Sequence, residues 1–371
     1  MRIGILGTRG IPNHYGGFEQ FAEFFATYAA SKGHEVYVYN SHNHPYQKKD
    51  FKEVHIVHCY DPESKIGTVG QFIYDLNCIR DARKRDFDII LQLGYTSSSV
   101  WFSLHPKNAV VVTNMDGLEW KRTKYSKIVQ KALQIAERLA VKKSDYLISD
   151  SIGIQKYINE KYRKESTYIA YGAHNFTTPN AEILKQYQVE PQNFNMIMAR
   201  FEPENNIEMV LDGVYSSDNK TTILVIGNYN TKFGAYLKNK FSRAEHIRFM
   251  GPIYDLEHLN NLRFYSNLYF HGHTVGGTNP SLLEAMASKA LIASHDNDFN
   301  KGVLKENAYY FSTAEEVKKI LNTIKKSDNL RFVENNYAVI ASTFNWEKIN
   351  EQYLQLFEQC LAGNSDRKQK Q

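Results

Sequence analysis

The sequence has little cysteine, no long apolar run and almost no net charge, and each absence excludes a class of protein. Its 3 cysteines among 371 residues are odd in number and widely scattered, which argues against a disulfide framework and for a reducing compartment. No stretch approaches the roughly 20 apolar residues that cross a bilayer, and the strand-like run after Met1 is not a signal-peptide pattern. The net charge of +5, from 45 basic and 40 acidic residues, is too small to indicate a nucleic-acid partner.

What the sequence does contain is a regular alternation of short apolar runs and amphipathic stretches. Its length suggests about two domains of roughly 150 residues each, and the alternation is typical of parallel α/β units. An apolar face over residues 18–30 predicts a helix, which Gly33 ends. The predicted strands cover residues 2–6, 36–39, 55–59, 88–93, 109–113, 146–149, 195–199, 222–227, 247–250, 268–271 and 291–294.

A polar segment at residues 172–192 separates two halves, and each half opens with a strand, a turn-rich loop and a helix. We therefore predict two Rossmann-like, doubly wound α/β domains that face a cleft, at residues 1–175 and 176–345. Residues 346–371 are predicted to form a helix that crosses back to the first domain, followed by a disordered tail from Asn364.

The first glycine-rich loop lies between a strand and a helix and ends in Gly16 and Gly17. Unpaired N–H groups at the start of a helix favour an anion, and paired glycines let the backbone approach it closely. A nicotinamide dinucleotide site would need Gly-x-Gly-x-x-Gly and an acidic residue ending the second strand, where this chain has Asn40. A tight turn without a ligand is the alternative.

The second glycine-rich loop is the strongest feature of the sequence. Asn279 and Pro280 specify a helix start, as N-cap and first helical residue. Gly276 and Gly277 directly before them leave the first amides open to an anion. Glu284, on the second turn, can accept hydrogen bonds from a sugar hydroxyl, or it can simply complement the helix dipole.

Three further residues are candidates for the chemistry. Arg200 ends the first strand of the second half, and its forked donors suit a diphosphate, although it could instead pair with Glu202 or Glu204 on the surface. Asp116 follows a strand and is either a base or a turn residue. His273 is a candidate donor to a leaving phosphate or a sugar hydroxyl.

No metal site is predicted. Asp296 and Asp298 have the spacing that holds a divalent cation in some nucleotide-sugar enzymes, but they lie in an Asn-rich loop that is better explained as a cap or turn. The two pairs of histidines spaced i, i+2 lack the cysteines or carboxylates that would complete a zinc site.

Basic residues concentrate in residues 121–143, which carry eight Lys or Arg and one acid, Glu137, for a charge of 8 − 1 = +7. The same segment has an apolar helical face. A basic amphipathic helix can lie on anionic lipid, whereas an ordinary solvated helix is the simpler explanation. The residues that we expect at a membrane or acceptor are Lys121, Arg122, Lys124, Lys127 and Lys131.

These motifs resemble the retaining family 4 glycosyltransferases of the GT-B fold, and most of all their bacterial rhamnosyltransferase-like branch. The matching stretches are spread over nearly the whole chain in the family's order, at residues 7–19, 33–36, 116–122, 200–206, 276–286 and 346–361. The resemblance implies two Rossmann-like domains, of which the first binds the acceptor and the second binds a nucleotide-sugar donor.

The resemblance also assigns roles to single residues. It places Glu284 on the ribose hydroxyls, Arg200 on the diphosphate, and Asp116 where many relatives have a cleft histidine. Together with His273, named above for its place beside the glycine-rich loop, Asp116 and Arg200 form the predicted catalytic set. Two positions depart from the family: Gly276 replaces the first glutamate of a Glu-x7-Glu motif, and Asn205 replaces a lysine of the diphosphate site. The implied donor-binding set is Gly16, Gly17, Arg200, Asn205, Gly276, Gly277, Thr278, Asn279, Ser281 and Glu284.

The expected activity is a metal-independent hexosyl transfer that needs no cofactor besides a nucleotide-diphosphate sugar. The resemblance suggests deoxythymidine-diphosphate rhamnose as donor and a lipid-linked oligosaccharide as acceptor, in bacterial surface polysaccharide synthesis. The protein is then expected in the cytoplasm, peripheral on the inner face of the cell membrane. The alternatives are a sugar-nucleotide epimerase of the same fold and a non-catalytic nucleotide-sugar-binding protein.

Overall fold

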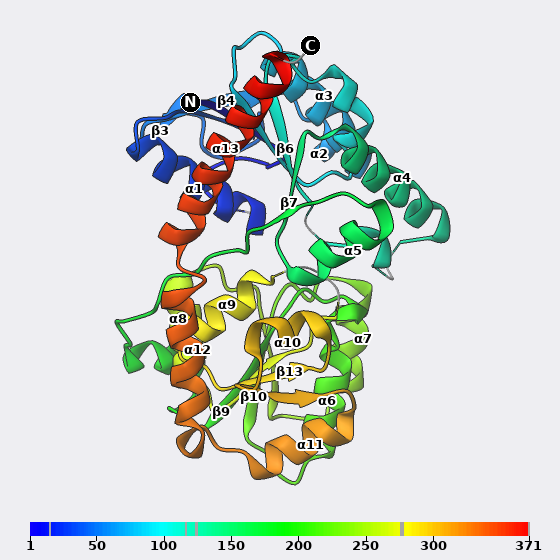
Figure 1. The fold of residues 1–371 in the computed structure, drawn as a ribbon. Helices are drawn as coiled ribbons and strands as arrows, with labels where there is room; N and C mark the ends of the chain where they lie inside the picture. The colour runs from blue at the N-terminus through cyan, green and yellow to red at the C-terminus, as the bar shows by residue number, and fades with distance from the viewer. Residues whose placement is uncertain (15, 116, 123–124, 275–277, 370–371) are drawn as a thin grey trace. The chain divides into compact units, whose positions relative to one another are not determined.

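The computed structural model describes the chain except for residues 15, 116, 123–124, 275–277 and 370–371, and it describes side chains as far as Asn364 (Figure 1). The chain divides into two compact units. Unit 1 comprises residues 1–121, 125–171 and 346–371, and unit 2 comprises residues 122–124 and 172–345. Residues 172–175, which the sequence placed in the first domain, belong to unit 2.

Unit 1 is built on a sheet of eight strands in the order β3-β4-β2-β1-β5-β6-β7-β8, parallel except for the β3–β4 pair. Buried Ile, Val and Leu dominate its central strands, as expected for a parallel sheet covered on both faces. The strands are β1 (Arg2–Leu6), β2 (Glu35–Ser41), β3 (Asp50–Phe51), β4 (Val54–Cys59), β5 (Ile89–Leu93), β6 (Val110–Asn114), β7 (Tyr146–Ser149) and β8 (Thr167–Tyr168).

The last helix, α13, belongs to unit 1 (Figure 1), and aromatic rings attach it to α1. The ring of Phe25 on α1 lies 5.3 Å from that of Tyr353 and 5.7 Å from that of Phe357 on α13. The prediction that the C-terminal helix returns to the first domain is thus confirmed. The helices of unit 1 are α1 (Gly17–Ser31), α2 (Glu63–Ile66), α3 (Gly70–Ala82), α4 (Lys127–Lys143), α5 (Ile152–Tyr162) and α13 (Trp346–Gln369), with short 3-10 turns η1 (Gly67–Val69), η2 (Ser99–Leu104) and η3 (Glu119–Lys121).

Unit 2 is built on a six-stranded parallel sheet in the order β11-β10-β9-β12-β13-β14. The chain starts at β9, winds outward to β11, and then crosses to β12 on the other side of β9. The strands are β9 (Phe194–Met198), β10 (Thr222–Ile226), β11 (Ile247–Gly251), β12 (Tyr269–His271), β13 (Ile292–His295) and β14 (Tyr309–Phe311).

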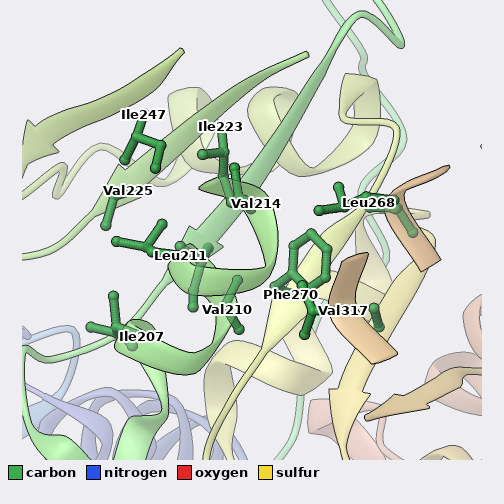
Figure 2. Close-up of a cluster of buried hydrophobic side chains, with 14 of the residues drawn as sticks. Ile207, Val210, Leu211, Val214, Ile223, Val225, Ile247, Leu268, Phe270 and Val317 are labelled. Carbon is green, nitrogen blue, oxygen red and sulfur yellow. The ribbon is translucent and has the colours of Figure 1, made fainter. Parts of the chain in front are cut away.

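The core of unit 2 lies where α6 packs on this sheet (Figure 2). Ile207, Val210, Leu211 and Val214 recur at helical spacing and are all buried, beside Phe270 of β12. The helices of unit 2 are α6 (Ile207–Ser216), α7 (Lys232–Lys240), α8 (Leu256–Tyr265), α9 (Pro280–Ala287), α10 (Asp298–Leu304), α11 (Ala314–Thr323) and α12 (Leu330–Ser342), with 3-10 turns η4 (Ala181–Tyr187), η5 (Pro203–Asn205) and η6 (Lys326–Asp328).

Three local predictions were wrong or incomplete. The tail predicted to be disordered from Asn364 continues helix α13 to Gln369. The basic helix is shorter than residues 121–143, because Ser126 caps α4 by accepting a hydrogen bond from the backbone N of Val129. The two- and three-residue strands β3 and β14 were missed. Among the described residues, no helix is both long and apolar enough to span a membrane.

Candidate functional site

The order of the strands in unit 2 directs attention to one edge of its sheet. β9 pairs with β10 on one side and with β12 on the other. Strands β10 and β11 follow on the first side, and the chain then crosses β9 to add β12, β13 and β14 on the second side, so the strand order reverses at β9. Ligands of open α/β sheets bind outside the carboxyl ends of the strands at such a reversal. Arg200 follows β9, and His273 follows β12. The topology thus brings two candidate residues, 73 positions apart in sequence, to one edge.

Side-chain and backbone hydrogen bonds fix the two loops at this edge to one another. The amide of Asn206 donates to the carbonyl of Gly272 at 2.7 Å, and the backbone N of Thr274 donates to the carbonyl of Glu204 at 3.2 Å. A Cβ at Gly272 would lie 2.2 Å from the carbonyl oxygen of Asn205. Only glycine therefore permits this close approach of the two loops.

Asn205, predicted to bind the donor, lies within this loop structure. Its side chain is buried, and its amide donates to the carbonyl of Arg200 at 2.8 Å. Asn205 therefore holds the backbone of Arg200, whose own side chain is exposed. A direct contact of Asn205 with a ligand stays a prediction.

His273 lies in a cationic environment. Burial, and then the charges of Arg200 and Arg122, lower its pKa from 6.5 to about 3. Its ring stacks on that of His271 with centroids 4.4 Å apart, and burial also holds the pKa of His271 well below its usual value. Both imidazoles are therefore neutral at pH 7. His273 can donate or accept a hydrogen bond there, but it cannot supply a positive charge.

The loop after β13 binds the backbone of His273. The amides of Asn297 and Asn300 donate to the carbonyl oxygen of His273 at 3.0 and 3.1 Å, and Asn297 also caps α10. Asp296 pairs with Lys301 at 2.6 Å. The cap in this loop is thus Asn297, between the two acidic residues, and Asp298 opens α10.

Helix α9 begins at this edge as the sequence predicted. Asn279 is its N-cap and accepts hydrogen bonds from the backbone N and the hydroxyl of Ser281, both at 2.9 Å. Thr278 is buried just before the cap. Gly276 and Gly277 lie outside the described residues, as do Asp116 and Lys124.

Glu284 has a partner that sequence reasoning missed. Nη2 of Arg263, on α8, donates to Oε2 of Glu284 at 2.6 Å, and Nη1 donates to Oδ1 of Asn260 at 3.0 Å. The side chain of Arg263 is fully buried, whereas that of Glu284 is 18% exposed. The signal in the sequence was the position of Arg263 directly after Leu262, an apolar residue that is buried on the same helix. An arginine in such a position needs an acidic partner.

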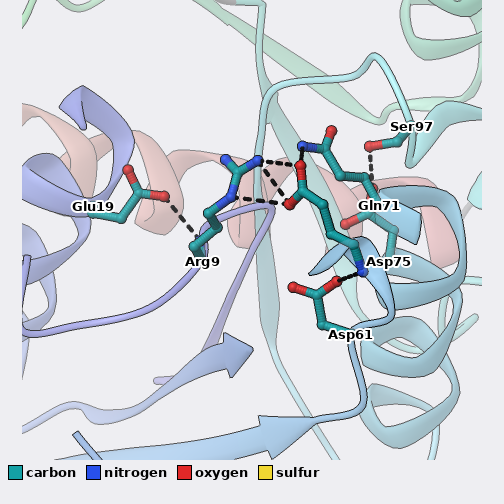
Figure 3. Close-up of polar contacts among 7 residues, drawn as sticks. Arg9, Glu19, Asp61, Gln71, Asp75 and Ser97 are labelled. Atoms are coloured by element: carbon teal, nitrogen blue, oxygen red, sulfur yellow. Dashed lines mark hydrogen bonds and ion pairs between the residues drawn. The ribbon is translucent and has the colours of Figure 1, made fainter. Parts of the chain in front are cut away.

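Unit 1 has a polar cluster of residues that follow the carboxyl ends of β1, β4 and β5 (Figure 3). Arg9 binds both carboxylate oxygens of Glu63 at 2.9–3.2 Å, and the amide of Gln71 donates to the same carboxylate at 2.8 Å. The hydroxyl of Ser97 donates to Asp75 at 2.6 Å, and burial raises the pKa of Asp75 to about 7. The pair of Arg9 and Glu63 crosses from the loop after β1 to the start of α2.

An open pocket of about 270 Å³ lies against this cluster. Its walls combine hydrogen-bond donors and acceptors with the ring of His14, which meets that of His44 edge-on at 4.3 Å. Such mixed polar walls are suited to a ligand that carries several hydroxyl groups. The lining residues are Arg9, His14, Ser41, Asn43, His44, Asp61, Glu63 and Ser64.

Gly16 and Gly17 stand at the start of α1, where the sequence predicted an anion. Gly16 is the N-cap residue, and Gly17 opens the helix. An acidic side chain already lies in this first turn, because Glu19 accepts hydrogen bonds from the backbone N of Arg9 at 2.9 Å and the hydroxyl of Thr8 at 3.3 Å. A diphosphate at Gly16 and Gly17 would therefore lie near a carboxylate.

The residues predicted to meet a membrane divide between the two units. Lys127 and Lys131 lie exposed on α4, and Lys121 lies exposed on η3. Arg122 instead belongs to unit 2, with a side chain only 14% exposed and its Nη1 4.0 Å from Oε1 of Glu204. Arg122 therefore lies at the edge at β9 and β12, away from the exposed lysines of α4, and its contact with a membrane or acceptor stays a prediction.

Comparisons with known proteins agree on the fold. Residues 1–174 match a family described as "Domain of unknown function (DUF1972)". A protein of Methanocaldococcus jannaschii described as an uncharacterized glycosyltransferase is 27% identical over 224 residues, covering 57% of this chain and 50% of that protein. The chain thus spans about half the length of this curated relative.

Solved structures are similar over nearly the whole chain. Sucrose-phosphate synthase from Thermosynechococcus elongatus gives a TM-score of 0.78 at 16% identity, covering 98% of this chain and 99% of that one. The HepE protein of Anabaena in complex with UDP-glucose gives 0.76 at 15% identity, with 96% and 99% covered. WaaG, a glycosyltransferase of lipopolysaccharide biosynthesis, gives 0.72 at 12% identity, with 96% and 99% covered. The chain therefore has the GT-B fold, as the sequence predicted.

Proposed function

We propose that this protein is a retaining glycosyltransferase that takes a sugar from a nucleotide-diphosphate donor bound to unit 2. The observation that carries the proposal is the grouping of Arg200, His273, the start of α9 and Glu284 at the strand reversal of one sheet. Guanidinium groups and helix N-termini suit a diphosphate, and a carboxylate suits ribose hydroxyls. A GT-B neighbour bound to UDP-glucose supports a nucleotide sugar as the ligand.

In the proposed reaction, the bond between the sugar's anomeric carbon and the diphosphate breaks, and its electron pair leaves with the diphosphate. The acceptor hydroxyl oxygen attacks the same face of the sugar, and its proton passes to a phosphate oxygen. Arg200 stabilises the charge that develops on the leaving group, because a cation already in place needs no reorganisation at the moment of reaction. His273, neutral at pH 7, donates a hydrogen bond to the donor, and Asp116 is the proposed acceptor-side residue.

We further propose rhamnose, carried by deoxythymidine diphosphate, as the transferred sugar. This assignment rests on the resemblance of the loops at residues 7–19 and 276–286 to the rhamnosyltransferase-like branch. Gly276, in place of a glutamate that holds donor-sugar hydroxyls, is consistent with a sugar that lacks one of them.

The donor is tested by thermal unfolding in the presence of a panel of nucleotide-diphosphate sugars. A donor present at about 100 times its Kd should stabilise the protein by about 2.7 kcal/mol, and deoxythymidine-diphosphate rhamnose is expected to give the largest rise in Tm. Each stabilising donor is then incubated with and without a saccharide acceptor, and the released nucleotide is measured.

Nucleotide release that depends on the acceptor supports transfer. Release or isomerisation of the sugar from donor alone would favour an epimerase instead. Stabilisation without any turnover would favour a non-catalytic nucleotide-sugar-binding protein. If no donor stabilises the protein, the proposed donor site in unit 2 is wrong.

For the acceptor, we propose a lipid-linked oligosaccharide that binds to unit 1. The polar pocket beside Arg9 and Glu63 provides donors and acceptors for saccharide hydroxyls. The surface of helix α4, in the same unit, favours a contact with lipid. Its Ile128 and Ile135 are 82% and 61% exposed, and its one acidic residue, Glu137, is buried. The solvent-facing charges of α4 are therefore all basic, which suits an anionic membrane.

Reversing the charges of Lys127 and Lys131 should weaken binding to anionic vesicles. Each lysine near such a surface contributes about 1 kcal/mol, so the double change to glutamate is expected to lower partitioning at least about 30-fold. The measurement is flotation with vesicles of phosphatidylglycerol and, for comparison, of neutral phosphatidylcholine. The matched control reverses Lys142 and Lys143, two exposed lysines at the other end of α4. Equal flotation of the first variant and the wild type would reject a membrane role for the start of α4.

A further inference from the structure

Arg122 occupies a place that its position in the sequence does not suggest. It follows η3 of unit 1 directly, yet its contacts place it in unit 2. Its side chain is 14% exposed, and Nη1 lies 4.0 Å from Oε1 of Glu204, whose side chain is 3% exposed. The guanidinium is therefore largely withdrawn from water beside the loop that follows β9.

The neighbours of Glu204 place this guanidinium at the proposed donor site. The carbonyl oxygen of Glu204 accepts hydrogen bonds from the backbone N of Thr274 at 3.2 Å and from its hydroxyl at 2.8 Å. Thr274 directly follows His273 at the end of β12. Arg122 thus reaches the same edge as Arg200, and the charges of both arginines lower the pKa of His273.

Arg200 and Arg122 bring two guanidinium groups to this edge, and Glu204 lies beside one of them. The side chain of Arg122 is largely withdrawn from water, so its charge acts on a bound anion more strongly than that of an exposed arginine. A diphosphate carries two or more negative charges, and the planar fork of arginine matches phosphate oxygens in pairs. Asn205, at the position where the resemblance to family 4 glycosyltransferases implies a lysine, is buried and donates to the carbonyl of Arg200, and it adds no charge to this edge.

We propose that Arg122 is a second cationic ligand of the donor's diphosphate and supplies the charge that Asn205 does not. The inference rests on the proposed function, because it assigns the anion at this edge to a nucleotide diphosphate. It predicts that the leaving group is bound by one arginine from the loop after β9 and by another from the segment that follows η3.

The test compares the wild type with Arg122→Gln and Arg200→Gln by isothermal titration with uridine and deoxythymidine diphosphates, the parent nucleosides and inorganic pyrophosphate. Arg122→Gln is expected to raise the Kd for the nucleoside diphosphates and for pyrophosphate about 10- to 100-fold. Its Kd for the nucleosides should stay unchanged. Arg122→Lys, which keeps the charge and loses the fork, should fall in between. Arg243→Gln, at an exposed arginine elsewhere in unit 2, should bind like the wild type.

Removing Arg122 alone leaves the buried carboxylate of Glu204 without this cation, so the unfolding of each variant is measured first. If Arg122→Gln does not fold, the double variant Arg122→Gln/Glu204→Gln removes both charges and is titrated instead. Unchanged diphosphate binding by a folded Arg122 variant would overturn the inference, even where Arg200→Gln weakens it. If the wild type binds pyrophosphate but no nucleotide, the nucleotide-diphosphate assignment fails with the proposed function. If the wild type binds neither, both are rejected.

Discussion

Replacing Arg200 with alanine is expected to lower the rate of sugar transfer about 10²–10³-fold, the loss seen when one preorganised charge stabiliser is removed from an active site. The Arg200 side chain is exposed at the end of β9, while its backbone is held by Asn205. The substitution should therefore remove a charge and leave the loop folded. The measurement is kcat and KM for transfer from the donor identified in the thermal screen.

Two variants make this result specific. Arg243→Ala removes an exposed arginine from another surface loop of unit 2 and should leave transfer unchanged. Arg200→Lys keeps the charge without the fork and should recover part of the rate. Wild-type transfer by Arg200→Ala would show that this arginine has no part in the reaction.

Replacing Glu284 with alanine should lower the free energy of unfolding by about 3–5 kcal/mol, the usual cost of breaking a buried ion pair. Arg263 has no exposed surface, and its Nη2 donates to Glu284 at 2.6 Å. The alanine variant would leave the guanidinium buried without this carboxylate. The measurement is urea unfolding followed by far-UV circular dichroism.

This expectation changes how the role of Glu284 in binding must be tested, since loss of nucleotide binding by the alanine variant could follow from misfolding. The double variant Arg263→Met/Glu284→Gln removes both charges, and uncharged replacements of a buried pair are often neutral or stabilising. It should therefore unfold near the wild-type urea concentration and still bind nucleotide weakly. If the double variant binds nucleotide as tightly as the wild type, Glu284 does not hold the ribose. Wild-type stability of Glu284→Ala would instead contradict the importance of the ion pair.

Features that depend only on residues close together in the sequence could be predicted without a structure. The strands at residues 2–6 and 146–149 were placed to the residue, because buried parallel strands are short runs of apolar residues. The start of α9 was placed because Asn279 and Pro280 act on their own helix. Each of these signals is local, since the residues involved lie within a few positions of one another.

Features that depend on a partner far along the chain could not be predicted. Glu137 counted only as the one acid of a basic segment, yet it is buried and accepts hydrogen bonds from Trp120, Tyr157, Lys161 and Tyr162 at 2.6–3.0 Å. Its donors lie 17 to 25 positions away and come from η3 and α5. A charge count therefore assigned Glu137 to the solvent-facing surface of the helix. The packing of α4, η3 and α5 instead buries it.

The sequence by itself determined the doubly wound architecture, the returning C-terminal helix, the loop that contains Arg200 and the start of the helix that contains Glu284. These follow from hydrophobic period, capping and turn residues, which act within one element. Only the tertiary structure showed that Arg263 donates to Glu284 and that Asn205 binds the backbone of Arg200. It also showed that Arg122 contacts Glu204 at the edge at β9 and β12, although it belongs to the basic segment in sequence. The physical reason is that a buried charge must find a partner in space, and the distance along the chain sets no limit on where that partner lies.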